Sequence, residues 1–263
     1  MSVPVQVLGD ELRRWRTRRR WSQLELAIRA ETTQRHVSFI EQGRSRPGRA
    51  MVVRLAETLG LSLRDRNTLL LAAGYAPVYA ETPLDAPVLQ PVRDAIEHIL
   101  AGHMPYPALV ARPYGELIAA NSAISVLTDG ACPDLLEPPL NVLRLALHPD
   151  GMAQRVVNLA EWGRHITNSL RGQAARSPDP QLDEFIGELE GYLPADAPGH
   201  DHVGFAVPLR LRSDDGELRL ITTLSTFATA VDVTISELHL EAFLPVDPDT
   251  AEILRSRAGP LLK

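Results

Sequence analysis

Apolar residues recur at helical spacing in two short runs near the N-terminus of the chain. In the first run, Leu24, Ala27 and Ile28 fall on one helical face. After a short polar break, Val37 and Ile40 recur three residues apart in a second run. Two short helices joined by a tight turn are typical of a helix-turn-helix, whose second helix enters the major groove of DNA.

Residues at the ends of both runs support two separate helices. Ser22 is a good N-cap, and Glu25 three residues later completes a capping box. Thr33 caps the second helix. Gly43 ends it, because glycine tolerates the positive φ that follows many helices.

The outward face of the second helix carries side chains that suit DNA. Gln and Arg form paired hydrogen bonds with adenine and guanine edges, and Phe packs on a thymine methyl. The loop that follows holds three arginines, which suit phosphates. A solvated face on an ordinary helical hairpin is the alternative. The predicted DNA-binding residues are Gln23, Thr33, Gln34, Arg35, Ser38, Phe39, Arg44, Arg46 and Arg49.

Three motifs resemble the phage-repressor (Xre-type) family of regulators. They read Ser-Gln-x-Glu-Leu-Ala at 22–27, Ser-Phe-Ile-Glu-x-Gly-Arg-Ser-Arg-Pro at 38–47, and Ala-Ala-Gly-Tyr-Ala-Pro at 72–77. Nearly the whole chain is similar to regulators of the MmyB-like class. This resemblance implies a PAS-like ligand-binding domain behind the DNA-binding domain.

The pattern divides the chain into a helical head at 1–76, a Pro-rich linker at 77–91 and a mixed body at 92–263. The expected fold is a five-helix, phage-repressor-like helix-turn-helix domain, followed by a PAS-like domain with a five-stranded antiparallel sheet and helices. In the body we expect strands at 108–112, 116–120, 203–212, 218–227 and 231–243, and helices at 92–101, 121–127, 141–147, 153–171 and 180–192.

The body resembles PAS-like sensors, some of which hold fatty-acyl or other apolar molecules between sheet and helices, and this resemblance implies a ligand site there. Arginines and an asparagine would orient a polar head group. A close-packed core without a pocket is the alternative. The candidate ligand-binding residues are Arg112, Asn121, Leu143, Arg144, Leu147, Trp162, Ile166, Phe205, Val207, Leu209, Thr222 and Leu224.

Charge is distributed unevenly along the chain. The net charge of −6 combines +7 over residues 1–80 with −13 over the remainder. A basic head on an acidic body indicates that the head alone binds double-stranded DNA. A homodimer, supported by the body, would read an inverted-repeat operator.

Other classes of function find little support. We find no phosphate-binding loop, nucleophile elbow or zinc-binding helix motif, so we expect neither an enzyme nor a metal site. The single cysteine, Cys132, fits a reducing cytoplasm, and no stretch is apolar enough to span a membrane. We therefore expect a cytoplasmic regulator that senses a small apolar ligand. A DNA-binding protein whose body only dimerises or binds protein remains the alternative.

Overall fold

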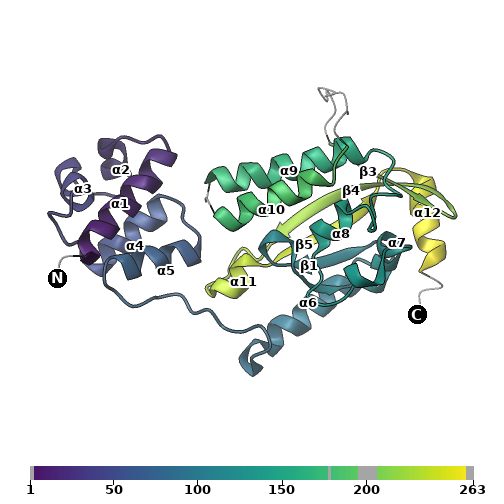
Figure 1. The fold of residues 1–263 in the computed structure, drawn as a ribbon. Helices are drawn as coiled ribbons and strands as arrows, with labels where there is room; N and C mark the ends of the chain where they lie inside the picture. The colour runs from purple at the N-terminus through teal and green to yellow at the C-terminus, as the bar shows by residue number, and fades with distance from the viewer. Residues whose placement is uncertain (1–2, 177–178, 195–205, 259–263) are drawn as a thin grey trace. The chain divides into compact units, whose positions relative to one another are not determined.

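The fold was analysed in a computed structural model that describes residues 3–176, 179–194 and 206–258 (Figure 1). Contacts divide the chain into two compact units. The first unit comprises Met1–Pro83 together with Ala228–Ser236, and the second comprises Leu84–Phe227 together with Glu237–Lys263.

Five helices around one apolar core form most of the first unit. The predicted caps are confirmed: the hydroxyl of Ser22 accepts a hydrogen bond from the amide of Glu25 at 3.0 Å, and that of Thr33 from the amide of His36 at 3.1 Å. Gly43 has a φ of 67° after the third helix, as expected. The helices are α1 Val3–Arg18, α2 Gln23–Arg29, α3 Gln34–Glu41, α4 Arg49–Thr58 and α5 Leu63–Ala72.

The expected apolar face of α2 is wrong in part. Ala27 is buried, but Leu24 is 51% exposed and Ile28 is 68% exposed. The helix instead buries Leu26, which is fully enclosed in the core. Because α2 is only seven residues long, the spacing of its few apolar residues fits two different faces.

The chain leaves the first unit along a segment that is held by hydrogen bonds at two points. On α5, the side-chain amide of Asn67 donates to the carbonyl of Tyr79 at 2.7 Å, and its oxygen accepts from two further amides. Beyond Tyr79, the buried carboxylate of Asp232 accepts from the hydroxyl of Thr82 at 2.6 Å, and the amide of Val233 donates to the carbonyl of Ala80 at 2.8 Å. We call this set of contacts, centred on Asn67 and Asp232, the linker clasp.

A five-stranded antiparallel sheet organises the second unit (Figure 1). Its strand order is β2-β1-β5-β4-β3, so the last three strands of the chain lie beside the first two. This confirms the expected fold class of a helical head followed by five strands with helices. The strands are β1 Ala108–Ala111, β2 Leu117–Ala120, β3 Leu209–Ser213, β4 Gly216–Thr226 and β5 His239–Pro245.

Helices cover both faces of this sheet. On one face, α6 packs with Ile96 and Leu100 against Val110 of β1. On the other face, α8 and α9 supply Leu147 and Trp162 to the main apolar cluster, and α10 lies beside α9 (Figure 1). The helices are α6 Gln90–Gly102, α7 Ser125–Thr128, α8 Val142–Leu147, α9 Leu159–Arg176, α10 Pro180–Gly191, α11 Val233–Glu237 and α12 Pro248–Arg257, with short 3-10 turns at Pro87–Leu89, Pro113–Gly115, Ser122–Ile124 and Pro133–Leu135.

Several expected boundaries need correction. The strand expected from residue 231 begins at His239, because α11 precedes it. The long helix expected from residue 153 begins at Leu159, because Val156 pairs with Leu211 instead. Residues 206–208 are not strand, so β3 begins at Leu209, and the earlier part of that expected strand lies outside the described residues. The α12 helix was not expected.

An ion pair joins α8 to α10 on the second unit. The guanidinium of Arg144 donates to both carboxylate oxygens of Glu188, at 2.6 and 2.9 Å, and the hydroxyl of Tyr192 donates to the same carboxylate at 2.6 Å. These hydrogen bonds, chiefly that from Arg144, lower the pKa of Glu188 to about 2. The charged carboxylate is therefore favoured in the folded state.

This pair predicts a loss of stability in acid. A carboxylate whose pKa is lower when folded stabilises the protein above its ordinary pKa of 4.5, and this contribution is lost as the pH falls toward 2. Since 40% and 35% of the two side chains stay exposed, we expect less than about 1 kcal/mol from it. Urea unfolding at neutral pH and near pH 3 should show a smaller pH dependence for Glu188→Gln than for the wild type. Replacing the exposed Glu184 of α10 with Gln is the control, and equal changes in both variants would contradict the prediction.

Candidate functional site

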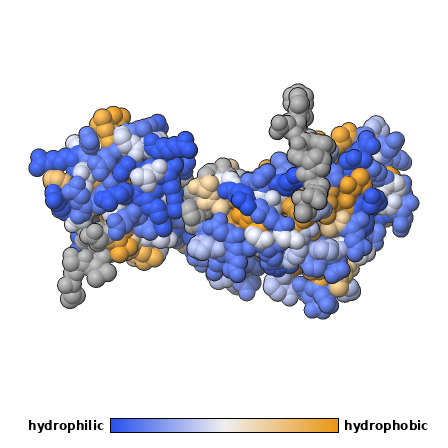
Figure 2. Space-filling view, turned by 45° about the horizontal axis from the view of Figure 1, so that its top comes forward, coloured by the Kyte–Doolittle hydropathy of each residue, from blue (hydrophilic) through white to orange (hydrophobic). Residues whose placement is uncertain are grey.

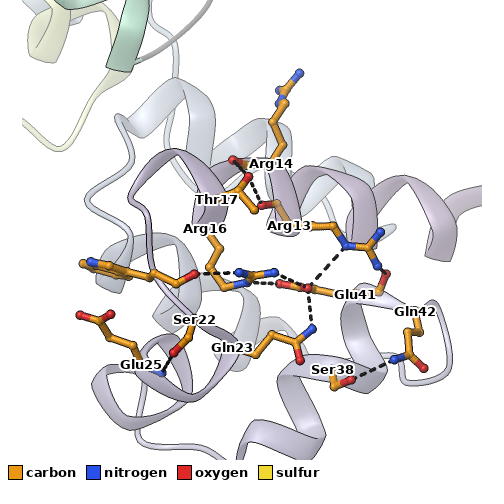
Figure 3. A network of polar contacts seen from close by, with 11 residues as sticks. Arg13, Arg14, Arg16, Thr17, Ser22, Gln23, Glu25, Ser38, Glu41 and Gln42 are labelled. Carbon is orange, nitrogen blue, oxygen red and sulfur yellow. Dashed lines mark hydrogen bonds and ion pairs between the residues drawn. The ribbon is translucent and has the colours of Figure 1, made fainter.

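One buried carboxylate attaches α3 to the rest of the first unit (Figure 3). Glu41 is 2% exposed and receives both arms of the Arg16 guanidinium, at 2.6 Å on Oε1 and 2.9 Å on Oε2. The side-chain amide of Gln23 donates to Oε2 at 2.8 Å. Arg16 also donates to the carbonyl of Trp21 at 2.7 Å, so one arginine ties together α1, α3 and the segment before α2.

The close approach of α1 to α3 makes this network possible. A Cβ at Gly9 would lie 2.8 Å from the carbonyl oxygens of Ile40 and Glu41, so only glycine fits there without a shift. Arg13 adds a hydrogen bond to the Glu41 carbonyl at 3.0 Å. Burial acts to raise the pKa of Glu41, but the hydrogen bonds and charge of Arg16, with Gln23, outweigh it and lower the pKa. The position of α3 is thus fixed by a satisfied, charged carboxylate.

The outward face of α3 brings together four of the predicted DNA-binding residues. Gln34 and Arg35 are the first two residues of the helix and are exposed. The Arg35 guanidinium lies over the Phe39 ring at 5.1 Å, and Ser38 accepts a hydrogen bond from Gln42 at 2.9 Å. The sequence reasoning missed Gln42, although it stands four residues after Ser38 and therefore on the same face.

Two other predicted residues are engaged within the protein. The Gln23 side chain is bound to Glu41, and the Thr33 hydroxyl caps α3. These bonds leave the backbone groups and the other polar atoms of Gln23 and Thr33 for contact with DNA.

Three arginines follow α3, as the sequence indicated. Arg44, Arg46 and Arg49 are exposed, and none has an ion-pair partner among the described residues. Figure 2 shows the surface of this unit as mostly hydrophilic. The three unpaired guanidinium groups are therefore available to neutralise an anionic surface.

The predicted apolar ligand-binding residues gather in the main cluster of the second unit. Leu147, Trp162 and Leu209 are buried in it, and Leu143, Ile166 and Val207 pack against it partly buried. Thr222 and Leu224 stand further along β4 and are exposed. Phe205 lies outside the described residues.

The predicted polar ligand-binding residues have partners of their own. Arg112 pairs with Glu116 at 3.0 Å, and Arg144 pairs with Glu188. Asn121 is buried and bonds three backbone groups, at 3.1, 3.1 and 2.9 Å. These three side chains therefore act within the fold, and their contact with a ligand stays a prediction.

Comparison with known proteins identifies the family. A family model described as the MmyB-like transcription regulator ligand binding domain matches residues 92–256, more than half of the chain. The chain belongs to this family. A second model, described as a helix-turn-helix domain, matches residues 7–69. The two matches make the protein a DNA-binding transcription regulator of the MmyB-like class.

Solved structures add two weaker similarities to the regulator. A hypothetical transcription factor NHTF from Neisseria is 28% identical, with 26% of this chain and 74% of that chain covered and a TM-score of 0.23. The clp gene regulator ClgR from Corynebacterium glutamicum is 22% identical, with 39% of this chain and 95% of that chain covered and a TM-score of 0.24. At these TM-scores neither structure carries an argument. No curated protein matches the regulator significantly.

The described residues of the regulator contain neither a membrane-spanning helix nor a cluster of metal ligands. None of the helices found there has the length and hydrophobicity that crossing a bilayer requires. Nor do three or more His, Cys, Asp or Glu side chains gather there as the ligands of a metal ion would.

Removing the Glu41 carboxylate should destabilise the DNA-binding unit. Glu41→Ala leaves the largely buried Arg16 without its partner, and breaking a buried pair in this way costs about 3 kcal/mol. Urea unfolding of the full chain measures the loss. The matched control is Glu57→Ala, whose carboxylate is exposed and bonds Arg66 at 3.3 Å, and which should cost less than about 1 kcal/mol. Similar losses in both variants would show that the network does not hold α3.

Proposed function

We propose that the regulator reads an inverted-repeat operator in double-stranded DNA as a homodimer, and that its body senses a small apolar molecule such as a fatty-acyl compound. The proposed reading of DNA rests on the exposed face of α3, which the buried Glu41 network holds in place. The protein acts by binding alone and not as an enzyme.

In this proposal, α3 lies in the major groove. Gln34 and Arg35 stand at its N-terminal end, where recognition helices reach base edges. Arg44, Arg46 and Arg49 follow the helix and meet phosphates, which positions the helix without reading sequence. The unpaired state of these arginines supports the assignment.

Two-fold symmetry follows from the small reach of one recognition helix. A single helix covers only a few base pairs, so two heads reading half-sites about 10 base pairs apart would bind specifically. The acidic body is the proposed dimer support, because the head alone offers only a small surface.

Sensing is proposed for the second unit because of its family and its apolar cluster. Trp162 of α9 and Leu209 of β3 belong to one cluster between helices and sheet. On β4 the same face continues beyond the buried Leu220 to Leu224, which is 65% exposed. An apolar molecule would lie along this exposed part, stabilised by about 0.8 kcal/mol for each buried methylene.

The proposed link from body to head is the linker clasp. Residues 228–236 connect β4 to β5, yet they group with the DNA-binding unit. Asp232 binds Thr82, and Asn67 of α5 binds Tyr79 three residues earlier. A change in β4 and β5 would thus be passed to the end of α5 through partly buried hydrogen bonds.

Arg35 and Arg46 should affect DNA binding in different ways. Arg35→Ala removes a paired contact with a base, which should relax discrimination at one position of each half-site by about 1–3 kcal/mol. Arg46→Ala removes a phosphate contact, so it should weaken all sequences alike and lower the slope of log K against log salt by about 0.9. Titrations of operator and random DNA over a range of salt concentrations separate the two effects.

The matched control for both variants is Arg29→Ala, since Arg29 is exposed on α2 and bonds Glu25 within its own helix. It should change neither discrimination nor slope. Equal weakening of operator and random DNA by Arg35→Ala would make Arg35 a phosphate contact, and a footprint over one isolated half-site would contradict the dimer.

Asp232→Ala should separate sensing from DNA binding. In the wild type, a probe that binds the body should raise the melting temperature and change operator affinity, because it stabilises one DNA-binding state. In the variant, we expect the thermal shift to remain and the change in operator affinity to disappear. Saturated fatty acids and acyl esters of increasing length are the probes.

Asp249→Ala on the exposed start of α12 is the control and should behave as the wild type. If the wild type shows no shift with any chain length, the body does not sense fatty-acyl compounds. A variant that keeps the full response would exclude the clasp as the link.

A further inference from the structure

A histidine and a glutamate form a polar pair on β5, in the middle of the sheet. Nε2 of His239 lies 3.3 Å from Oε1 of Glu241. Their side chains are 20% and 18% exposed, so both are largely enclosed while still reaching accessible space. A partly enclosed carboxylate beside an apolar cluster is a candidate for binding a polar group, because it still reaches accessible space.

The register of the strands shows which face the pair occupies. Residues directly opposite each other in an antiparallel pair point to the same face. Glu241 lies opposite Leu109 of β1 on one side and opposite Leu224 of β4 on the other, and His239 lies opposite Ala111. Leu109 and Ala111 belong to the main apolar cluster with Trp162 of α9. The pair therefore lies on the face that carries this cluster, which we call the inner face.

Part of the inner face is open. Leu218 and Leu220 of β4 are buried in the main cluster, and alternation along the strand places Thr222, Leu224 and Thr226 on the same face. All three are exposed, Leu224 by 65%. The helices thus cover one half of β4 and leave the other half accessible, beside Glu241.

Glu241 also differs from the other carboxylates of this region in its partners. Glu188 receives hydrogen bonds from Arg144 and Tyr192, and Asp179 from Tyr114 and an amide. Glu241 has only the contact between Oε1 and His239, and its Oε2 has no partner in the described part of the chain. One carboxylate oxygen on the inner face is therefore left to accept a hydrogen bond.

We propose that Glu241 and His239 form the head-group end of the ligand site, and that the ligand is an amphipathic molecule with a hydrogen-bond-donating head, a hydroxyl or an ammonium group. The apolar part of the ligand lies along Leu224 on the open half of the inner face, and the head donates to Oε2 of Glu241. This inference rests on the proposed sensing function and names the chemical class of the ligand.

Charge complementarity decides between head groups. A carboxylate head at this place would meet the Glu241 carboxylate, and like charges at close distance repel. The arginines that would offset this repulsion are already bound, Arg112 by Glu116 and Arg144 by Glu188. A hydroxyl or ammonium head instead completes the hydrogen bonding of Glu241.

The test compares three probes with the same apolar chain, decanol, decylamine and decanoate, by calorimetric titration of the full-length regulator. We expect decanol and decylamine to bind about tenfold more tightly than decanoate, as one hydrogen bond to a charged group would give. Glu241→Gln should remove most of the preference for decylamine. Glu252→Gln, an exposed carboxylate on α12, is the matched control and should leave all three affinities unchanged.

A second variant, Glu241→Lys, reverses the charge and serves if Glu241→Gln folds poorly. Glu241→Lys should reverse the order, so that decanoate binds more tightly than decylamine, and a gain of binding does not arise from misfolding. Equal binding of all three probes to the wild type, unchanged in Glu241→Gln, would overturn the subsite but keep the sensing proposal. Failure of every probe to bind the wild type would overturn both.

The open half of the inner face has one other candidate occupant, a second copy of the chain. Leu224→Asp distinguishes the two, because it places a charge on this face. If size-exclusion chromatography shows that the variant is a monomer while the wild type is a dimer, the face is an interface between copies and the subsite is wrong. An unchanged oligomeric state together with weaker decanol binding supports the subsite.

Discussion

The ion pair between Arg16 and Glu41 is the interaction on which the DNA-binding face depends. Two charges taken out of water are stable together only when their geometry is good and their remaining hydrogen bonds are satisfied. Here the guanidinium meets both carboxylate oxygens, and Gln23 satisfies Oε2 further. Small displacements of α3 would break several of these bonds at once. The outward orientation of Gln34 and Arg35 is therefore fixed from inside the head.

This pair could have been predicted in part from the sequence. Glu41 stands four residues after Val37, and Arg16 stands four residues after Leu12, so both charged residues lie in phase with buried positions. A charge on a buried face must find a partner. What the sequence does not show is that α1 approaches α3, because that approach depends on the missing Cβ of Gly9. The caps at Ser22 and Thr33 needed no such information, since both are local.

Two features of the body could not be predicted from sequence patterns. Residues 231–237 are rich in Val, Thr and Ile, which favours strand. Val233–Glu237 nevertheless form α11, because Asp232 bonds the amide of Thr234 and the linker residue Thr82. Contacts between residues 150 positions apart leave no periodic signal. Alternation along β4 likewise assigns its residues to two faces of the sheet. It does not show which face the helices cover, or that the helices cover this face only as far as Leu220. For this reason the exposure of Thr222 and Leu224 could not be foreseen.

The same two strands carry the open part of the inner face and the segment that joins the head. β4 ends at Thr226 and β5 begins at His239, and between them residues 228–236 belong to the DNA-binding unit. Glu241 is therefore only a few residues from α11, and Leu224 lies opposite it at the end of β4. A ligand can shift an equilibrium only through a difference in its affinity for two states. A molecule bound between Leu224 and Glu241 would contact both strands at the point where they leave the sheet. Such a molecule would therefore bind some positions of β4 and β5 better than others, and this is the difference in affinity that the proposed link through Asp232 requires.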